Sequence, residues 1–123
     1  MDAQERQDLE RYGSWERMTG GEWFLPSMPE AKEEHQRTFR LVKQLNELQN
    51  TDQERAKGIL REILPEESAV PGLHVPLNLE YGCNVTVGKG VFINFGATIL
   101  AQAPVTLGDR VMLGPNCSLI TVG

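Results

Sequence analysis

Residues 87–98 read VGKGVFINFGAT and residues 107–118 read LGDRVMLGPNCS. Both stretches repeat in sixes, and the period runs over eight units from Val75 to Gly123, with two extra residues at 105 and 106. The first position of the unit is aliphatic in seven of the eight units, and glycine follows it in four. The fifth position is small or apolar in every unit. A repeat sustained over this length decides the fold of the second half of the chain.

The six-residue period favours a parallel β-solenoid. Neither a 3.6-residue helix nor a long alternating strand keeps two inward positions in every six residues. Short strands joined at regular corners do so, because the large aliphatic residue fills the interior and the small residue turns the corner. With three units per turn, a coil takes about 18 residues and adjacent coils lie about 4.8 Å apart. Residues 75–123 then form fewer than three coils of an incomplete solenoid.

The charged residues divide the chain into two regions. Residues 1–68 hold 25 of the 29 charged side chains, whereas residues 69–123 hold eight of the 12 glycines. We therefore expect an α-helical N-terminal region over 1–68 and the first two to three solenoid coils over 69–123.

Three helices are expected in the first region. Apolar residues at three-residue spacing predict a helix over residues 4–18, ended by Gly20 and Gly21. A second helix starts at Pro29, with Ser27 as a possible cap, and carries the stripe Phe39, Val42, Leu45 and Leu48. Thr51 and Glu54 form a capping box that opens a third helix, which Pro65 ends.

Composition excludes several function classes. A net charge of -5 argues against a nucleic-acid or membrane surface, since both need clustered positive charge. No stretch approaches the roughly 18 apolar residues of a spanning helix, and the N-terminus has no apolar signal region. Two cysteines are too few for a disulfide scaffold, so we expect a cytoplasmic protein. His35 lies among glutamates and is interpreted as a surface histidine, with no metal site around it.

The repeat resembles the hexapeptide repeat of the left-handed β-helix acyltransferases. Gly21-Glu22-Trp23-Phe24, the helix pair at 29–64 and the run from Tyr81 to Gly96 narrow this resemblance to the maltose/galactoside O-acetyltransferases, over residues 14–123. The resemblance implies a homotrimer that moves acetyl from acetyl-CoA to a sugar hydroxyl. It also implies a helical region packed over the sugar pocket and a β-helix that binds the coenzyme between subunits.

Acetyl transfer needs a general base and a donor for the oxyanion of the intermediate. In the family, the base is a histidine directly after the coil that here ends at Gly123, and neither His35 nor His74 matches its position. Asn94 matches the family asparagine that stabilises the transition state. Taken from the residues alone, an asparagine after Ile93 can equally occupy a corner that needs left-handed backbone.

The resemblance also places acceptor-binding residues, with departures. Glu80 stands where the galactoside enzyme has serine, and Gln102 stands where it has an aspartate. Trp23 and Phe24 lie in the segment that reaches the pocket; Trp23, like Trp15, can instead be a core or inter-subunit anchor. The segment 25–28 lacks the family's acidic residue, so the acceptor sugar is left open.

Two functions follow from these patterns. The first is a hexapeptide-repeat sugar O-acetyltransferase, C-terminally truncated before the catalytic histidine and inactive as given. The alternative is a non-catalytic remnant of such an enzyme with an oligomerising or binding role. Cys117 is interpreted as core packing, because it occupies the small inward corner position of its unit. Cys83 is interpreted as a packing or surface thiol and not a nucleophile, since no histidine or other base neighbours it in sequence.

Overall fold

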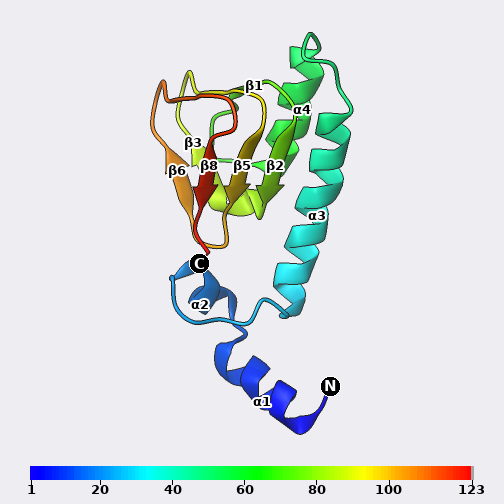
Figure 1. The fold of residues 1–123 in the computed structure, drawn as a ribbon, viewed down its shortest axis with the longest axis vertical. Coiled ribbons are helices and arrows are strands. Elements are labelled where there is room, and N and C mark those ends of the chain that lie inside the picture. Colours follow the sequence, from blue (N-terminus) through cyan, green and yellow to red (C-terminus); the bar gives the residue numbers. More distant parts are fainter. Residues whose placement is uncertain (123) are drawn as a thin grey trace.

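Helices form the first half of the chain and short strands the second (Figure 1). The computed structural model describes residues 1–122. The helices are α1 (Ala3–Tyr12), α2 (Trp15–Thr19), α3 (Pro29–Asn46) and α4 (Gln53–Ile63). The strands are β1 (Gly72–Leu73), β2 (Leu77–Glu80), β3 (Val85–Val87), β4 (Phe92–Ile93), β5 (Ala97–Leu100), β6 (Val105–Leu107), β7 (Met112–Leu113) and β8 (Ser118–Ile120). A 3-10 turn, η1 (Gly82–Asn84), precedes β3.

The strands form three parallel sheets, ordered β1-β4-β7, β2-β5-β8 and β3-β6. Consecutive strands lie in different sheets, and every third strand pairs in parallel with its predecessor. The chain therefore winds through all three sheets in turn, which is the topology that the six-residue period predicts.

One coil takes 20 residues, not the expected 18. Leu73 pairs with Ile93, and Ile93 pairs with Leu113, so the register advances by 20 residues each time. The difference arises at one corner, where each coil carries two residues more than three hexads. In the first coil this corner holds η1, and in the second it holds the turn at 101–104.

The longer coil also changes the frame of the repeat. Leu73 pairs with Ile93 and Leu79 pairs with Ile99, so Leu73 and Leu79 occupy the first positions of their units in the first coil. They stand in place of the predicted Val75 and Tyr81, respectively. Val105 pairs with Val85 and is part of the repeat rather than an extra residue. The predicted fifth-position role of Gly123 lies outside the described residues.

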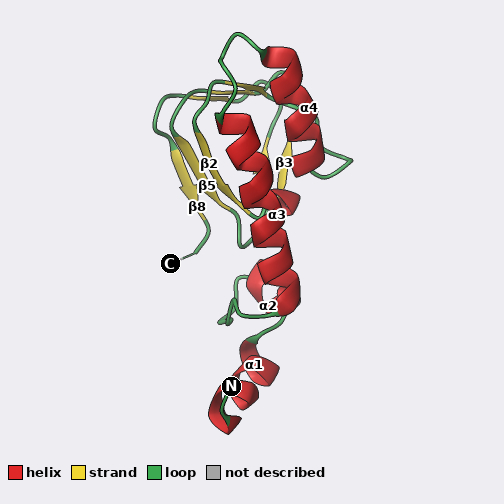
Figure 2. Ribbon diagram, turned by 90° about the vertical axis from the view of Figure 1, so that its right-hand side faces the viewer, coloured by secondary structure: helices red, strands yellow, loops and turns green. Residues whose placement is uncertain are grey.

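Helices α3 and α4 pack along the side of the coil and close its core (Figures 1 and 2). α3 contacts β2 and α4, and α4 contacts β1. A single cluster of buried apolar side chains runs from these helices into the coil, and includes Leu45, Leu60, Ile63, Leu73 and Ile99. The helices therefore complete the hydrophobic core of the first coil, which the coil alone leaves open on this side.

The helix boundaries differ from the sequence predictions. The expected helix over 4–18 is two helices, because the chain breaks at Gly13 and Ser14 caps α2 by accepting from the Arg17 N–H at 3.1 Å. Pro29 is at the first helical position as expected, but the N-cap residue is Met28 and not Ser27. Helix α4 begins after Asp52 with no side-chain cap, so the capping box at Thr51 is wrong.

The apolar stripe of α3 is also rotated from the prediction. Leu41, Val42 and Leu45 are buried, whereas Phe39 is 50% exposed and packs on His35 instead. None of the helices within residues 1–122 is long and apolar enough to cross a membrane.

Candidate active site

A hollow of about 340 Å³ opens between the start of α3 and the corner where β2 and β5 end. Its lining comes from three parts of the chain that the coil and the helix bring together: Pro26, Lys32, His35, Gln36, Glu80, Tyr81 and Gln102. Lys32, His35 and Gln36 are spaced by three and four residues and therefore share one face of α3.

Glu80 and Gln102, the two acceptor-binding residues predicted from the resemblance, are in direct contact. The Gln102 Nε2 amide donates to Glu80 Oε2 at 3.1 Å. An ionised carboxylate only accepts hydrogen bonds, so the contact requires the amide NH₂ and not the amide oxygen to face Glu80. The 20-residue coil brings these residues together, because Glu80 pairs with Leu100 and Gln102 follows two residues later.

His35 belongs to this hollow, which the sequence analysis missed. Its Nε2 atom is 3.6 Å from Glu80 Oε2, an ion-pair distance beyond normal hydrogen-bond length. The ring centroid lies 4.1 Å from that of Phe39 and 5.5 Å from that of Tyr81. The sequence analysis interprets His35 as a surface histidine, and the structure places it half-buried in the lining of this hollow. Helix periodicity does not indicate which polar face of a helix meets a strand end. Within residues 1–122 no group of three acidic, cysteine or histidine side chains could hold a metal ion.

The backbone at this corner is constrained. Tyr81 has a φ of 57° and is buried, with its ring against Trp15 at a centroid distance of 6.1 Å. A bulky residue in the left-handed region costs about 1–3 kcal/mol and persists only where its surroundings hold it. Here the chain turns directly after Glu80, from β2 into η1. Burial, and then the charge of Glu80, raises the pKa of the Tyr81 hydroxyl, which stays protonated at neutral pH.

A half-buried polar cluster fixes α3 against this corner. Glu34 Oε1 accepts from the Cys83 N–H at 3.1 Å and pairs with Arg37 at 2.8 Å. Burial alone would raise the pKa of Glu34, but the hydrogen bond and charge of Arg37 outweigh it and lower the pKa. Burial, and then the charge of Glu34, raises the pKa of the Cys83 thiol to about 12. Cys83 is therefore a neutral thiol at physiological pH and no nucleophile, as its sequence context indicates.

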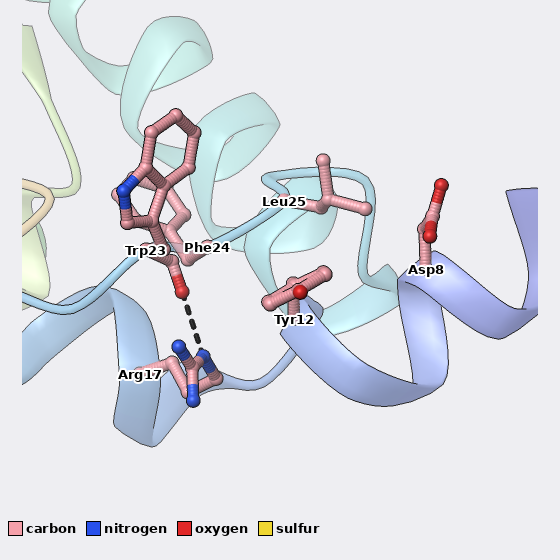
Figure 3. A pocket seen from close by; sticks show the side chains of 6 residues that line it. All are labelled: Asp8, Tyr12, Arg17, Trp23, Phe24 and Leu25. Atoms are coloured by element: carbon pink, nitrogen blue, oxygen red, sulfur yellow. Dashed lines mark hydrogen bonds between the residues drawn. The ribbon is translucent and has the colours of Figure 1, made fainter.

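Trp23 and Phe24 line a second hollow of about 390 Å³, which shares Pro26 and Gln102 with the first. The Trp23 side chain is 86% exposed, so it is not a core residue. Its backbone is held by Arg17, whose Nε donates to the Trp23 carbonyl at 2.6 Å (Figure 3). On the far side, Trp23 and Phe24 also line a hollow with Tyr12 and Leu25 (Figure 3).

Asn94 lies at a different corner of the coil, between β4 and β5, and lines neither of these hollows. Its Oδ1 accepts from the Phe95 N–H at 2.9 Å. Asn94 does not have a positive φ, so the alternative of a left-handed corner asparagine is wrong; Gly96 takes that conformation instead, with φ 83°. Nearby, His74 stacks on Phe95 at a centroid distance of 5.6 Å, and its Nδ1 is buried without a partner among the described residues.

The structure therefore brings together His35, Glu80 and Gln102, places Trp23 and Phe24 beside them, and leaves Asn94 apart. The resemblance drew attention to all of these residues except His35.

Residues 17–67 match the family model of the maltose acetyltransferase hexapeptide capping motif. The chain is 32% identical over 106 residues to Nodulation protein L of Rhizobium leguminosarum, covering 86% of this chain and 56% of that protein. It is 26% identical over 108 residues to the Galactoside O-acetyltransferase of Escherichia coli, covering 88% of this chain and 53% of that protein. The chain thus spans about half the length of the curated relatives it matches.

A solved structure is similar as well. The hexapeptide-repeat acetyltransferase of Vibrio cholerae complexed with acetyl coenzyme A superposes with a TM-score of 0.69 at 28% identity, over 85% of this chain and 57% of that one. Fold and repeat make the chain similar to the hexapeptide-repeat acetyltransferases. Its helical region and its motifs resemble those of the maltose and galactoside O-acetyltransferases, as the sequence indicates.

Proposed function

We propose that the chain is part of a sugar O-acetyltransferase that uses acetyl-CoA. The observation that carries the proposal is the contact of Glu80 with Gln102 in a hollow covered by α3, since both residues match acceptor-binding positions. The hollow has a size within the range of small-ligand sites, about 300–1,000 Å³. Its carboxylate, amide and ammonium groups suit a ligand rich in hydroxyl groups.

The proposed reaction is acyl transfer. A sugar hydroxyl oxygen attacks the thioester carbonyl of acetyl-CoA; a C–O bond forms, the C–S bond breaks, and the hydroxyl proton ends on the coenzyme thiol. In this proposal Glu80 and Gln102 hold the acceptor, and Trp23 and Phe24 pack against it. Asn94 stabilises the oxyanion of the intermediate. Acetyl-CoA is the co-substrate, supported by the coenzyme bound to the Vibrio relative.

We further propose a homotrimer, with Asn94 of one subunit close to the acceptor hollow of its neighbour. Two observations support this arrangement: Asn94 and Glu80 lie at different corners, and the coil exposes Phe95 and Met112. Light scattering should give about three times the 13.8 kDa of the chain, and a clean monomer counts against it. We also propose that the coil is left-handed and that the chain divides into a helical region at residues 1–68 and a coiled region at residues 69–123. The proposed location is the cytoplasm.

We also propose that a polypeptide of residues 1–123, assayed by itself, transfers acetyl slowly. His35 is held beside Glu80, and the Nδ1 atom of His74 is buried, so neither is placed as a free base at Asn94. A positioned general base contributes about 10²–10⁴-fold.

The test is an acetyl-transfer assay with acetyl-CoA and a panel of maltose, glucose and methyl β-galactoside, following thiol release. A low rate of thiol release that rises when sugar is added is expected. In Glu80→Gln, the increase in rate on addition of sugar should be smaller. Sugar binding without transfer under any condition would favour the alternative, a non-catalytic binding remnant. The absence of both sugar binding and acetyl transfer would reject the proposal.

A further inference from the structure

Three parts of the fold meet at one oxygen atom. Gln102, in the turn after β5, places its amide nitrogen 3.1 Å from Glu80 Oε2. His35, on α3, places its Nε2 atom 3.6 Å from the same Oε2. The helical region and two successive coils are thus linked through a single carboxylate at the end of β2.

This arrangement leaves the other oxygen available. Within residues 1–122, Glu80 Oε1 accepts no hydrogen bond, and Glu80 lines the hollow. One oxygen of the carboxylate is therefore in contact with its neighbours, and the other is free to accept a hydrogen bond from a ligand in the hollow that Glu80 lines. Hydrogen bonds to an ionised carboxylate are stronger than neutral ones, and a preoriented group loses less entropy on binding.

The ring of His35 is itself held in place. Phe39 contacts one side at a centroid distance of 4.1 Å, and Tyr81 lies at 5.5 Å. The imidazole is only 33% exposed. Since a carboxylate only accepts, the tautomer that suits this contact carries its proton on Nε2.

We propose that His35 is a positioning residue for the acceptor: with Gln102 it fixes Glu80 Oε2, so that Glu80 Oε1 accepts from a hydroxyl group of the sugar. The inference rests on the proposed function and assigns His35 a role that no sequence motif indicates. The ligand class is a neutral polyhydroxylated compound. A free carboxylate oxygen accepts hydrogen bonds, so it binds the hydroxyl groups of such a ligand.

Two substitutions separate this role from simple packing. His35→Phe keeps an aromatic ring against Phe39 and Tyr81 but removes the donor, whereas His35→Gln keeps an N–H donor and removes the ring. Binding of maltose and of methyl β-galactoside to the whole chain is measured by calorimetry. His35→Phe should weaken binding by about fivefold, because the 3.6 Å contact of Nε2 with Glu80 Oε2 is longer than a hydrogen bond and is worth no more than a partly exposed polar pair, about 1 kcal/mol. His35→Gln should restore binding to within about threefold.

Three controls complete the design. Arg40→Ala, at an exposed position of the same helix, should leave binding unchanged. The double variant His35→Phe/Glu80→Gln should bind no more weakly than Glu80→Gln alone, because both changes remove one interaction. Nitrogen NMR of the imidazole should show the proton on Nε2, and Glu80→Ala, which removes the acceptor, should shift that resonance.

The outcomes are distinct. Equal sugar binding by the native chain and His35→Phe overturns the inference, as does an additive double variant or a His35→Gln variant as weak as His35→Phe. If the native chain binds neither sugar and acetylates none, the proposed function fails and this inference fails with it. Sugar binding that is insensitive to His35 leaves the proposed function in place.

Discussion

The backbone N–H of Gly82 donates a hydrogen bond to the hydroxyl oxygen of Thr38 over 3.0 Å, and both residues are buried. The Thr38 hydroxyl in turn donates to Glu34 Oε1 at 3.1 Å. One hydroxyl group of α3 therefore satisfies the first N–H of η1 and joins the polar cluster beneath the candidate site. This bond ties the helix to the corner that carries Glu80.

Thr38→Val should lower the free energy of unfolding by about 1–3 kcal/mol. The substitution keeps the shape of the side chain but leaves the Gly82 N–H buried without a partner, and that desolvation cost is not recovered. Urea denaturation measures it. Thr106→Val, at an exposed position of β6, is the matched control and should stay within about 0.5 kcal/mol. Equal effects at the two sites would contradict the assigned role of Thr38.

Gly82→Ala should also destabilise the protein, for a steric reason. An added Cβ atom would overlap the Cγ2 atom of Ile63 and lie 3.1 Å from the Ile63 carbonyl oxygen. Overpacking of this kind costs about 1–3 kcal/mol. Gly58→Ala, in α4, meets nothing within 4 Å and should instead stabilise by about 0.5–1 kcal/mol. Thermal unfolding of the two variants should move in opposite directions; a shift of Gly82→Ala to higher temperature would refute the packing argument.

Acid should destabilise the protein partly through Glu34. Burial raises the pKa of Glu34, but Arg37 lowers it further, so the folded pKa lies below the unfolded one. The stability contributed by this group is present above the unfolded pKa of about 4.3 and is lost as pH falls through the folded value. Free energies of unfolding between pH 6 and pH 3 should therefore fall less steeply in Glu34→Gln than in the native chain. Glu33→Gln, on the exposed side of α3, is the control and should keep the native slope.

The repeat predicts the architecture but not the length of a coil. Aliphatic residues of successive coils lie one above another, as the six-residue period indicates: Ile93 pairs with Leu73, and Ile99 pairs with Leu79. The sequence analysis finds an extra pair in the second coil, although it places the pair at 105 and 106 and not in the turn at 101–104. It misses the pair in the first coil because the two corners differ in sequence, with Tyr81-Gly82-Cys83-Asn84 in one and Ala101-Gln102-Ala103-Pro104 in the other. Only the pairing of the strands shows that the two corners occupy the same place in successive coils. The sequence analysis therefore places the first position of two units in the first coil two residues too late in the sequence.

The sequence predicts only those residues of the candidate site that belong to a recognisable family motif. Glu80 and Gln102 are found by resemblance, and the coil explains why they meet. His35 is found only from the packing of α3 on β2, because a polar residue off the apolar stripe of a helix is ordinarily solvated. The same packing rotates Phe39 to the edge of the stripe, where it supports the His35 ring.

Trp23→Ala should weaken sugar binding with little effect on folding. The Trp23 side chain is 86% exposed, and its backbone is held independently by Arg17, so stability should change by no more than about 0.5 kcal/mol. The indole borders the hollow that shares Gln102 with the acceptor site and offers an apolar face to a pyranose ring. Calorimetry with maltose measures the loss. Ile120→Ala, another exposed apolar residue but on β8 of the coil, is the control. A dissociated oligomer with unaltered sugar binding would instead make Trp23 a subunit contact.

Added imidazole should speed acetyl transfer by the polypeptide of residues 1–123. The proposed slow rate arises because no free base is placed at Asn94: His74 has a buried Nδ1 and His35 is held at Glu80. A small base in solution can take the hydroxyl proton in its stead, although without the benefit of positioning. Thiol release is measured with maltose and increasing imidazole, and the protein-free reaction is subtracted.

Asn94→Ala should reduce this imidazole-dependent rate by about 10²–10³-fold, the usual cost of removing one oxyanion donor. Folding should be unaffected, since the Asn94 side chain makes one hydrogen bond, to an exposed neighbouring N–H. His74→Gln, at the same corner, should leave the rate unchanged because the His74 Nδ1 is buried. If imidazole has no effect while transfer is already fast, a residue within 1–123 supplies the base. Loss of activity in His74→Gln, with folding intact, would identify that residue as His74.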